Sequence, residues 1–247
     1  MKFSIITVCY NSAATLEQTI QSVLSQTYAN IEYIIIDGGS SDGSIDIINK
    51  YKDRIAHIVS EADGGIYDAM NKGIALSTGD VVGILNSDDI YAGERVIEHL
   101  AAQFRAMEVD AICTDVVIFK DRPENKIRMY RCNRWKPWMF RIGHQPPHPG
   151  FYVKKAFYDV YGVFNTKYKT AADFDLLLRF IHKHRIKTAY LNFTSVLMRS
   201  GGASQRSFGA LAKANMEDHH SLKENGYLSW YPLIWLKYAL KIFQFRA

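Results

Sequence analysis

Val81-Val82-Gly83-Ile84-Leu85-Asn86-Ser87-Asp88-Asp89 passes from an apolar run directly into polar and acidic residues. The apolar run is typical of a strand that is buried on both faces, as strands are in parallel sheets. Adjacent carboxylates at a strand end repel each other, which a cation would offset. Mg²⁺ commonly uses one or two protein carboxylates together with substrate phosphates. By itself, the segment is explained equally well by a solvated turn.

Apolar, β-branched runs and helix-like stretches alternate before this segment. Strands are predicted at 3–9, 31–36 and 55–59, and a helix at 66–76. Ser12 is expected to cap a helix after the first strand. This alternation predicts an α/β fold with an open, mostly parallel sheet, in which ligands bind beyond the carboxyl ends of the strands.

The polar clusters of the first half follow strands, which places them at one edge of the sheet. Asp37 ends a strand with three isoleucines and precedes two glycines, which let a ligand approach the backbone. A glycine-rich turn is the alternative. Tyr10 follows the first strand, where its ring could stack on a base or lie half-buried. The segment 61–65 adds acids after the third strand.

Several motifs in fixed order give a more specific indication. They are Thr7-Val8-Cys9-Tyr10-Asn11, Ser22-Val23-Leu24-Ser25-Gln26-Thr27-Tyr28, Glu32 to Gly43, Ala69-Met70-Asn71-Lys72-Gly73-Ile74-Ala75, Ser77-Thr78-Gly79-Asp80 and Leu85 to Asp89. Over about residues 3–205 the chain resembles glycosyltransferase family 2, of the bacterial surface-polysaccharide type. The resemblance implies a GT-A fold: a single Rossmann-like, mostly parallel mixed sheet flanked by helices, with a C-terminal helical appendage.

The resemblance also implies roles for individual residues. Those expected to bind a nucleotide-sugar donor, usually with uracil as its base, are Thr7, Tyr10, Asp37, Asp63, Lys72, Ser87, Asp88, Arg199 and Arg206. Asp88 and Asp89 are the expected ligands of Mg²⁺ or Mn²⁺ on the diphosphate. Asn86 stands where many relatives carry Asp. The two arginines flank a glycine-containing loop that could close over the diphosphate; as surface residues they could equally be solvated.

The segment Ala171-Ala172-Asp173-Phe174-Asp175-Leu176 resembles the Glu-Asp motif of the family, with Ala172 in place of the Glu. Asp173 is therefore the expected general base, which takes the proton of the acceptor hydroxyl in an inverting displacement. Asp175 is the alternative base. An acid in the first turn of a helix, favoured by the helix dipole, is the structural explanation of Asp173. His148 resembles a position near the acceptor cleft, or is structural.

The second half is less regular. A strand is predicted at 109–119, a turn at 121–125, an irregular wall through 135–150, a helix near Ala171 and a last strand at about 188–197. One GT-A domain is expected over 1–225, with a nucleotide-binding half to 115 and an acceptor half over 116–225, and the segment 226–247 follows it.

The segment 226–247 is rich in Trp, Tyr, Leu and Ile, and two lysines and a proline argue against a spanning helix. Lys237 and Lys241 are predicted on one helix face and Leu236 on another. An amphipathic helix at a membrane surface fits this pattern, and so does a helix packed on the protein's own core. A lipid-linked saccharide acceptor would explain a membrane surface site.

Composition limits the other functions and the cell compartment that the sequence allows. The 247 residues carry a net charge of +5 with scattered basic residues, which gives nucleic-acid binding little support. Three distant cysteines form no CxxC pair, and the apolar run at 3–9 is too short for a signal peptide. We therefore expect a cytoplasmic protein. In one alternative, it binds peripherally to the inner face of the plasma membrane. Two rival functions are a nucleotidyltransferase, although 10–13 is no basic, glycine-rich phosphate loop, and a nucleotide-sugar-binding protein that has lost catalysis.

Overall fold

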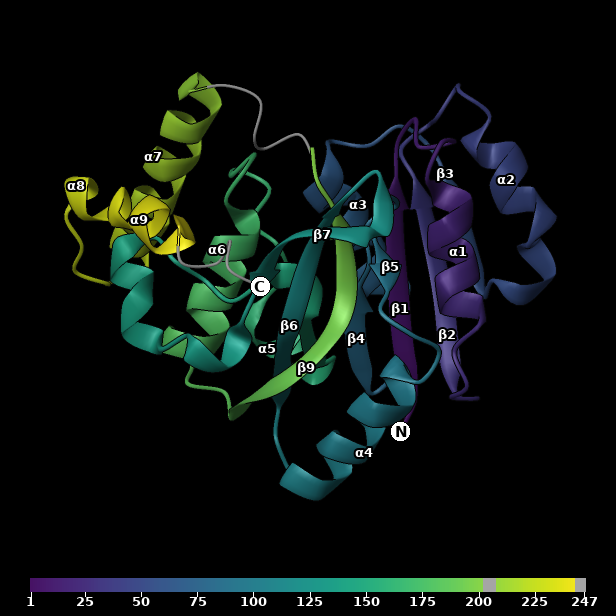
Figure 1. Ribbon diagram of the computed structural model, residues 1–247, viewed down its shortest axis with the longest axis horizontal. Coiled ribbons are helices and arrows are strands. Elements are labelled where there is room, and N and C mark those ends of the chain that lie inside the picture. Colours follow the sequence, from purple (N-terminus) through teal and green to yellow (C-terminus); the bar gives the residue numbers. More distant parts are fainter. Residues whose placement is uncertain (202–207, 243–247) are drawn as a thin grey trace.

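The computed structural model describes residues 1–201 and 208–242, and within them a mixed nine-stranded sheet is flanked by helices (Figure 1). Its parallel part contains four strands in the order β3-β2-β1-β4. They are β1 (Phe3–Cys9), β2 (Ile31–Asp37), β3 (His57–Ser60) and β4 (Val81–Ile84). The predicted strands of the first half are confirmed to within two residues at each end. Their continuous apolar runs are buried because helices cover the sheet.

Helices α1 (Leu16–Leu24), α2 (Ser44–Lys50) and α3 (Ile66–Leu76) connect these strands, and a short 3₁₀ turn (Lys52–Arg54) precedes β3. Each helix lies antiparallel to the strand before it, so α3 begins at the carboxyl edge of the sheet. Gly73 lets α3 approach β1, because a Cβ at that position would lie 2.4 Å from Cγ2 of Ile6. This contact fixes the start of α3 relative to the strand ends.

The remaining strands join mainly by antiparallel pairing. They are β5 (Ile90–Tyr91), β6 (Ala111–Lys120), β7 (Arg122–Tyr130), β8 (Phe151–Lys154) and β9 (Thr188–Arg199). β8 pairs antiparallel with both β4 and β6, while β6 and β9 are parallel. Helix α4 (Val96–Met107) connects β5 to β6. The sheet thus joins the two sequence halves through β8, next to β4.

Short helices cover the second half of the sheet. Three 3₁₀ turns, η2 (Cys132–Arg134), η3 (Pro137–Ile142) and η4 (His148–Gly150), form the irregular wall that the sequence predicts. They are followed by α5 (Ala156–Tyr161), α6 (Ala172–Leu177), the π-helix η5 (Leu178–Lys183), α7 (Phe208–Glu224), α8 (Tyr231–Ile234) and α9 (Leu236–Ile242). One hydrophobic core, around Phe140, Phe174 and Phe180, lies beneath these helices, and a second lies beneath α1 and α4.

Two local predictions are wrong. Ser12 does not cap α1 with its side chain: its Oγ donates to the carbonyl of Tyr10, while its own carbonyl accepts from Leu16. The turn predicted at 121–125 is reduced to Asp121, with φ of 60°, and a strand follows it at once. The residues of β7 are too polar to show a strand period, and pairing with β6 selects the strand.

The C-terminal segment also differs from expectation. Lys237 points inward, and its Nζ lies 2.6 Å from Oδ2 of Asp218 on α7. Leu236, expected on the apolar face, is half exposed. The helix is thus rotated relative to the sequence prediction because a buried carboxylate on α7 gives the lysine a partner. Among the described helices none is both long enough and apolar enough to traverse a bilayer.

Candidate active site

The polar clusters of the first half meet at the carboxyl edge of the parallel strands. Hydrogen bonds tie neighbouring strand ends together: Gly38 N–H donates to Cys9 O at 2.9 Å, and Leu85 N–H donates to Ile6 O at 2.9 Å. Glu61 N–H donates to Asp37 O at 3.0 Å. The residues that follow β1, β2, β3 and β4 therefore share one edge, as the sequence predicts.

Asp37 is the most enclosed acid of this edge. Its side chain is buried, and it accepts hydrogen bonds from the hydroxyls of Ser40 and Ser60 and from the backbone N–H of Gly39 and Ser40. Burial alone would raise the pKa of Asp37, but these hydrogen bonds outweigh burial and hold the pKa below its usual value. Asp37 is thus an ionised residue that orders the 37–40 turn.

Hydrogen bonds of Asn11 hold the segment after β1 against the same turn. Asn11, with φ of 48°, accepts at Oδ1 from Ser41 N–H at 2.9 Å, and its own N–H donates to Ser40 Oγ. Tyr10, next to it, is 66% exposed. These hydrogen bonds leave the Tyr10 ring exposed at the carboxyl edge of the sheet, where it can contact a planar ligand. The role of Asn11 was missed because its partner is 30 residues away.

Asp63 lies directly over Gly38. A Cβ on Gly38 would come within 2.6 Å of Asp63 Oδ2, so only glycine leaves this carboxylate in place. Lys72 on α3 lies on the same side, with Nζ 2.7 Å from Glu61 Oε1 and 3.8 Å from Asp68 Oδ2. The hydrogen bond from Lys72 to Glu61 raises the pKa of the lysine, which keeps it charged. The predicted residues Asp63 and Lys72 therefore lie in one polar group beside Asp37.

Thr7, like Asp37, is enclosed within the protein. Its side chain is fully buried, and its Oγ1 accepts a hydrogen bond from Tyr33 Oη at 3.0 Å. The hydroxyl therefore has no surface through which to contact a ligand in this structure. Ser87 is also mostly buried, and its Oγ donates to Ser12 Oγ at 2.8 Å.

The two acids after β4 have different environments. Asp89 is buried; its Oδ1 accepts from the backbone N–H of Arg199 at 3.1 Å, and Asn86 lies 3.4 Å from its Oδ2. Burial, followed by the charge of Asp88, raises the pKa of Asp89 well above its ordinary value. Burial also raises the pKa of the half-buried Asp88, while the Arg199 charge opposes that rise. The pair is therefore a site where negative charge is costly without a cation.

The oxygen atoms of this segment fit a hard divalent cation. The described residues contain no group of three or more acidic, histidine or cysteine side chains that could hold a metal ion. Asn86, however, has a buried Oδ1 without a hydrogen-bond partner among the described residues, beside the two carboxylates. Two carboxylates and one amide oxygen are a donor set that Mg²⁺ or Mn²⁺ accepts when substrate oxygens complete its shell.

Arg199, at the end of β9, lies beside this group, because β9 pairs with β5 directly after Asp89. Its guanidinium donates to Gln18 Oε1 at 2.9 Å and to Asp121 O at 3.0 Å, and it lies over the Phe119 ring. These contacts fix the guanidinium near the acidic pair. Arg206, the other predicted arginine, lies outside the described residues.

Asp173 lies in the first turn of α6 and is held by two side chains from other elements. Gln145 donates from Nε2 to Oδ2 at 2.6 Å, and Tyr67 Oη donates to Oδ1 at 3.2 Å. Tyr67 belongs to the first turn of α3, which begins at the carboxyl edge. Asp173 is therefore placed at the edge that carries the donor-side acids. Burial, then the charge of Asp173, raises the pKa of Tyr67, which keeps it a neutral donor.

The neighbouring acid Asp175 has a structural environment. It is buried, its Oδ2 accepts from Arg179 Nε at 2.9 Å, and its Oδ1 accepts from Ser221 Oγ at 2.8 Å. Arg179 in turn donates to three carbonyls of the 161–163 segment. Because it is buried and paired with Arg179, Asp175 is far less available to a substrate proton than the partly exposed Asp173.

The start of α6 is completed by a residue from α7. Glu217 Oε2 accepts from Thr170 N–H at 2.8 Å and from Ala171 N–H at 3.1 Å, which are donors that α6 leaves open. The motif lacks a Glu at position 172, and Glu217 supplies a carboxylate to the helix start instead. Sequence spacing gives no sign of this contact because the two residues are far apart in the chain.

His148 lies near Asp173 without a direct hydrogen bond between them in the described contacts. Its ring packs edge-on against Phe164 at 5.4 Å, and Phe164 stacks on Tyr67. Burial lowers the pKa of His148, while the charge of Asp173 opposes that shift. His148 thus belongs to the aromatic wall beside the carboxylate.

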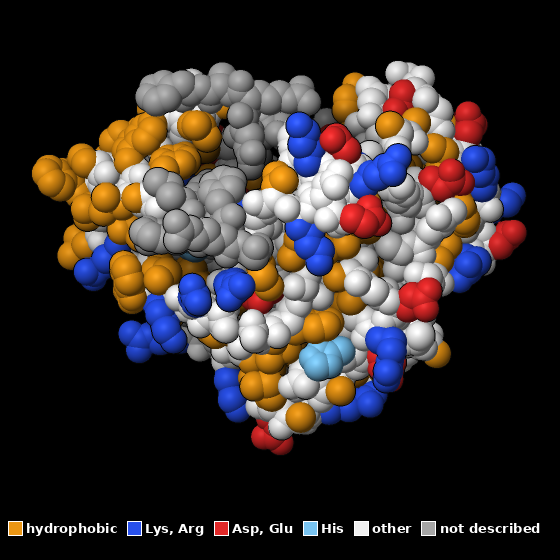
Figure 2. Space-filling model, viewed as in Figure 1, with side chains coloured by type: hydrophobic (Ala, Val, Ile, Leu, Met, Phe, Trp, Pro, Cys, Tyr) orange, Lys and Arg blue, Asp and Glu red, His pale blue; other side chains and the backbone are white. Residues whose placement is uncertain are grey.

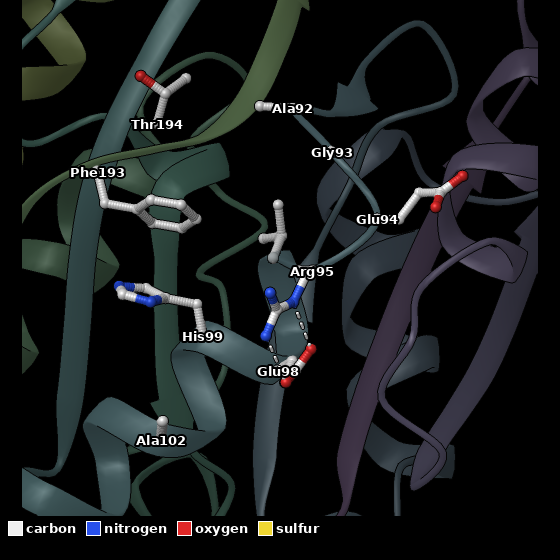
Figure 3. A pocket seen from close by; sticks show the side chains of 10 residues that line it. Ala92, Gly93, Glu94, Arg95, Glu98, His99, Ala102, Phe193 and Thr194 are labelled. Carbon is white, nitrogen blue, oxygen red and sulfur yellow. Dashed lines mark hydrogen bonds and ion pairs between the residues drawn. The ribbon is translucent and has the colours of Figure 1, made fainter.

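A cavity of about 490 Å³ lies elsewhere, between α4 and β9 (Figure 3). The rings of His99 and Phe193 contact each other at 4.4 Å in a tilted arrangement, and Arg95 and Glu98 pair in the lining of this cavity. None of the predicted site residues lines it. We therefore place the candidate active site at the strand ends, where the polar and acidic groups converge, and not in this cavity.

Known proteins identify the family of this chain. Residues 4–158 match the family described as Glycosyl transferase family 2. "Uncharacterized glycosyltransferase Rv1514c" of Mycobacterium tuberculosis is 32% identical over 182 residues, which cover 71% of this chain and 67% of that protein. "PGL/p-HBAD biosynthesis glycosyltransferase Rv2957" of the same organism is 27% identical over 213 residues, covering 85% and 78%.

Solved structures share the fold. Staphylococcus aureus TarS 1–349 in complex with UDP has a TM-score of 0.67 at 17% identity, over 90% of this chain and 65% of that one, so the chain spans just under two thirds of TarS 1–349. The mannosyltransferase PcManGT from Pyrobaculum calidifontis, in complex with GDP-Man and Mn²⁺, has a TM-score of 0.66 at 16% identity, over 97% and 69%. The family match and the mycobacterial relatives together show that this chain belongs to glycosyl transferase family 2 and is a glycosyltransferase.

Proposed function

We propose that this protein transfers a sugar from a nucleotide sugar, of the UDP class, to a hydroxyl group of a saccharide with inversion at the anomeric carbon. The observation that carries the proposal is the environment of Asp173. Two neutral donors orient its carboxylate, which remains partly exposed, and among the described residues it forms no salt bridge. Such a carboxylate can accept a proton from a hydroxyl that approaches it.

The proposed reaction is a single displacement. The acceptor oxygen attacks the anomeric carbon, Asp173 takes the hydroxyl proton, and the nucleoside diphosphate leaves with the electrons of the broken bond. Tyr67 and Gln145 hold the carboxylate in position by donating to both oxygens. His148 and Phe164 shield this side of the carboxylate as part of the acceptor site.

The donor is proposed to lie along the edge formed by β1, β2 and β4. Tyr10 stacks on the base from its exposed position, Asp63 lines the nucleotide side of the 37–40 turn, and the buried Asp37 holds that turn in place for the donor. Lys72, Ser87, Asp88 and Arg199 complete the proposed donor site, and Arg206 is assigned to it from the sequence alone. Thr7 supports the strand end from within the core.

A divalent cation, Mg²⁺ or Mn²⁺, is proposed to bind Asp88 and Asp89. When bound, it would neutralise the charge that develops on the departing diphosphate. The cost of holding two adjacent, partly buried carboxylates without a cation supports this assignment, as does the buried oxygen of Asn86. A structural neighbour was solved with GDP-Man and Mn²⁺, which is consistent with it.

The acceptor and the sugar are assigned by class. The neighbour TarS was solved with UDP and with UDP-GlcNAc, which supports a hexosyl or N-acetylhexosaminyl donor. The name of a relative refers to PGL/p-HBAD biosynthesis, which supports surface-polysaccharide or glycolipid synthesis with a saccharide that is free or lipid-linked. We propose a nucleotide-binding half over 1–115 and an acceptor half over 116–225, in a protein that acts in the cytoplasm at the inner face of the plasma membrane.

The test is donor turnover by the purified chain. Nucleotide sugars with uracil and guanine bases are incubated with Mn²⁺ or with EDTA, and nucleoside diphosphate release is measured. We expect release from a UDP-sugar with Mn²⁺, and a loss of at least 100-fold in Asp89→Asn, because the diphosphate then lacks its cation.

Other outcomes would identify the rival functions. A chain that binds nucleotide sugars without release, even with a panel of saccharide acceptors, would be a binding protein. Formation of pyrophosphate from a nucleoside triphosphate and a sugar phosphate would indicate a nucleotidyltransferase. Near-normal turnover in both Asp89→Asn and Asp173→Asn would show that the roles are assigned wrongly.

A further inference from the structure

The end of the chain builds an apolar surface that the proposed chemistry does not use. We define the C-terminal face as Trp138 on η3, Leu228 and Trp230 before α8, Leu233 on α8 and Leu236 on α9. These side chains are 55%, 84%, 70%, 36% and 49% exposed, respectively. In Figure 2, hydrophobic side chains gather at the end of the molecule where α8 and α9 lie in Figure 1. Exposed apolar patches of this kind mark interaction sites.

Buried packing and hydrogen bonds hold the C-terminal face in position. Ile234 is fully buried, and a Cβ on Gly143 would lie 2.7 Å from its Cγ2, so α8 packs closely on the end of η3. Ser229 Oγ donates to Arg141 O at 2.7 Å, and the Arg141 guanidinium lies over the Tyr227 ring at 5.3 Å. Lys237 is held beneath by Asp218. The outward position of Leu233 and Leu236 is therefore set by this packing.

Exposed basic residues border this face on the η2–η3 side. Between Glu124 and Asp159 the sequence contains eight lysines and arginines and no acid, and no acid follows Glu224. Arg134, Lys136 and Arg141 lie next to or within η3 and are exposed. Figure 2 shows Lys and Arg side chains bordering the hydrophobic end. A surface of Trp and Leu bordered by basic residues complements an anionic surface with an apolar interior.

We propose that the C-terminal face docks on a lipid bilayer that contains anionic headgroups. Trp138 and Trp230 lie at headgroup depth, Leu228, Leu233 and Leu236 enter the acyl boundary, and the basic residues of η2–η3 contact the headgroups. A symmetric pairing of two copies through this face would bring the basic residues of both copies into one interface. The bilayer is therefore the occupant that matches both the apolar and the charged parts.

The position of this face relative to the proposed base makes the docking useful. A Cβ on Gly143 would lie 3.3 Å from Cδ of Lys237 and 3.5 Å from Oδ2 of Asp218, and Gln145, two residues further along, donates to Asp173. The segment that supports the C-terminal face is thus the segment that orients the carboxylate. A lipid-linked acceptor would be presented beside Asp173, a consequence that rests on the proposed function, whereas the docking itself does not.

The experiment is flotation of the full chain with vesicles, without any substrate. Vesicles of phosphatidylcholine are compared with vesicles of phosphatidylcholine and phosphatidylglycerol. We expect binding to the anionic vesicles only. Arg134→Gln/Lys136→Gln should weaken partitioning roughly 30-fold, since each basic residue near an anionic surface contributes on the order of 1 kcal/mol. Trp230→Ser/Leu236→Ser should weaken it at least tenfold through lost apolar burial.

Matched controls separate the face from general surface effects. Val160→Ser removes an apolar side chain that is 71% exposed on α5, and Lys50→Gln/Lys52→Gln removes two charges near α2, at the opposite end of the molecule (Figure 1). Both should bind as the wild type does. Circular dichroism and light scattering of each variant check folding and oligomeric state. Equal binding by all variants, binding to neither vesicle, or a dimer that Trp230→Ser/Leu236→Ser dissociates would overturn the proposal.

Discussion

Lys237 on α9 and Asp218 on α7 form an ion pair, with Nζ and Oδ2 2.6 Å apart and both side chains nearly inaccessible. The pair attaches the last described helix to α7. Despite the lysine, burial raises the pKa of Asp218 to about 6, and the charge of Asp173 adds to that rise. The C-terminal segment is therefore joined to the body of the protein by a bond whose strength depends on pH.

Replacing Lys237 should destabilise the fold by less than the removal of one partner from a buried ion pair usually does. Removing one partner of a buried pair commonly costs about 3–5 kcal/mol. Here Asp218 already titrates near neutral pH and can bind a proton. We therefore expect Lys237→Met to lower the free energy of unfolding by about 1–3 kcal/mol at pH 7. Urea unfolding measures this loss, with Lys223→Met on the exposed side of α7 as the control. A loss no larger than that of the control would contradict the role of the pair.

The same carboxyl predicts a pH dependence of stability. Because the folded pKa of Asp218 is raised, its contribution is fully present below the unfolded pKa and is lost as the pH rises through about 6. Relative to Asp218→Asn, the wild type should thus gain up to about 3 kcal/mol between pH 7 and pH 4. Unfolding curves of both proteins across this range give the difference. A difference in the free energy of unfolding that does not change between pH 7 and pH 4 would show that the pKa of Asp218 is not raised in the folded state.

Asp88→Asn should have opposite effects on stability and on donor binding. Without metal, the variant removes the repulsion that raises the pKa of Asp89, so its free energy of unfolding should rise by about 1 kcal/mol. With Mn²⁺ and UDP, the wild type should be stabilised and the variant should not. Thermal shifts with and without both ligands test this. An Asp88→Asn protein that UDP and Mn²⁺ stabilise as strongly as the wild type would remove Asp88 from the metal site.

Gly38→Ala should weaken nucleotide binding with little loss of fold. The new Cβ would meet Asp63 Oδ2 at 2.6 Å and displace that carboxylate, whose end can move. We expect a roughly tenfold rise in the Kd for UDP, of the size of one lost hydrogen bond to a charged group. Gly93→Ala is the matched control, because nothing lies within 4 Å of a Cβ there. Calorimetry on both variants decides, and equal affinities would place Asp63 outside the donor site.

The parallel half of the fold was predictable from sequence because its signals are local. Continuous isoleucine and valine runs mark β1, β2 and β4, and polar clusters mark the edge where Asp37 and Asp88 lie. Contacts between distant segments were not predictable. Tyr67 and Gln145 meet Asp173 from positions 106 and 28 residues away. The inward turn of Lys237 depends on a carboxylate of α7, and β7 exists because β6 pairs with it.

The central claim is that Asp173 accepts the proton of the acceptor hydroxyl, and Asp173→Asn tests it most directly. The amide keeps the shape of the side chain but cannot take the proton. UDP-sugar binding, measured by calorimetry with Mn²⁺, should stay within about twofold of the wild type, while the rate of transfer to a saccharide falls by about 10²–10⁴. Transfer by Asp173→Asn at a rate near that of the wild type, with donor binding intact, would contradict the account.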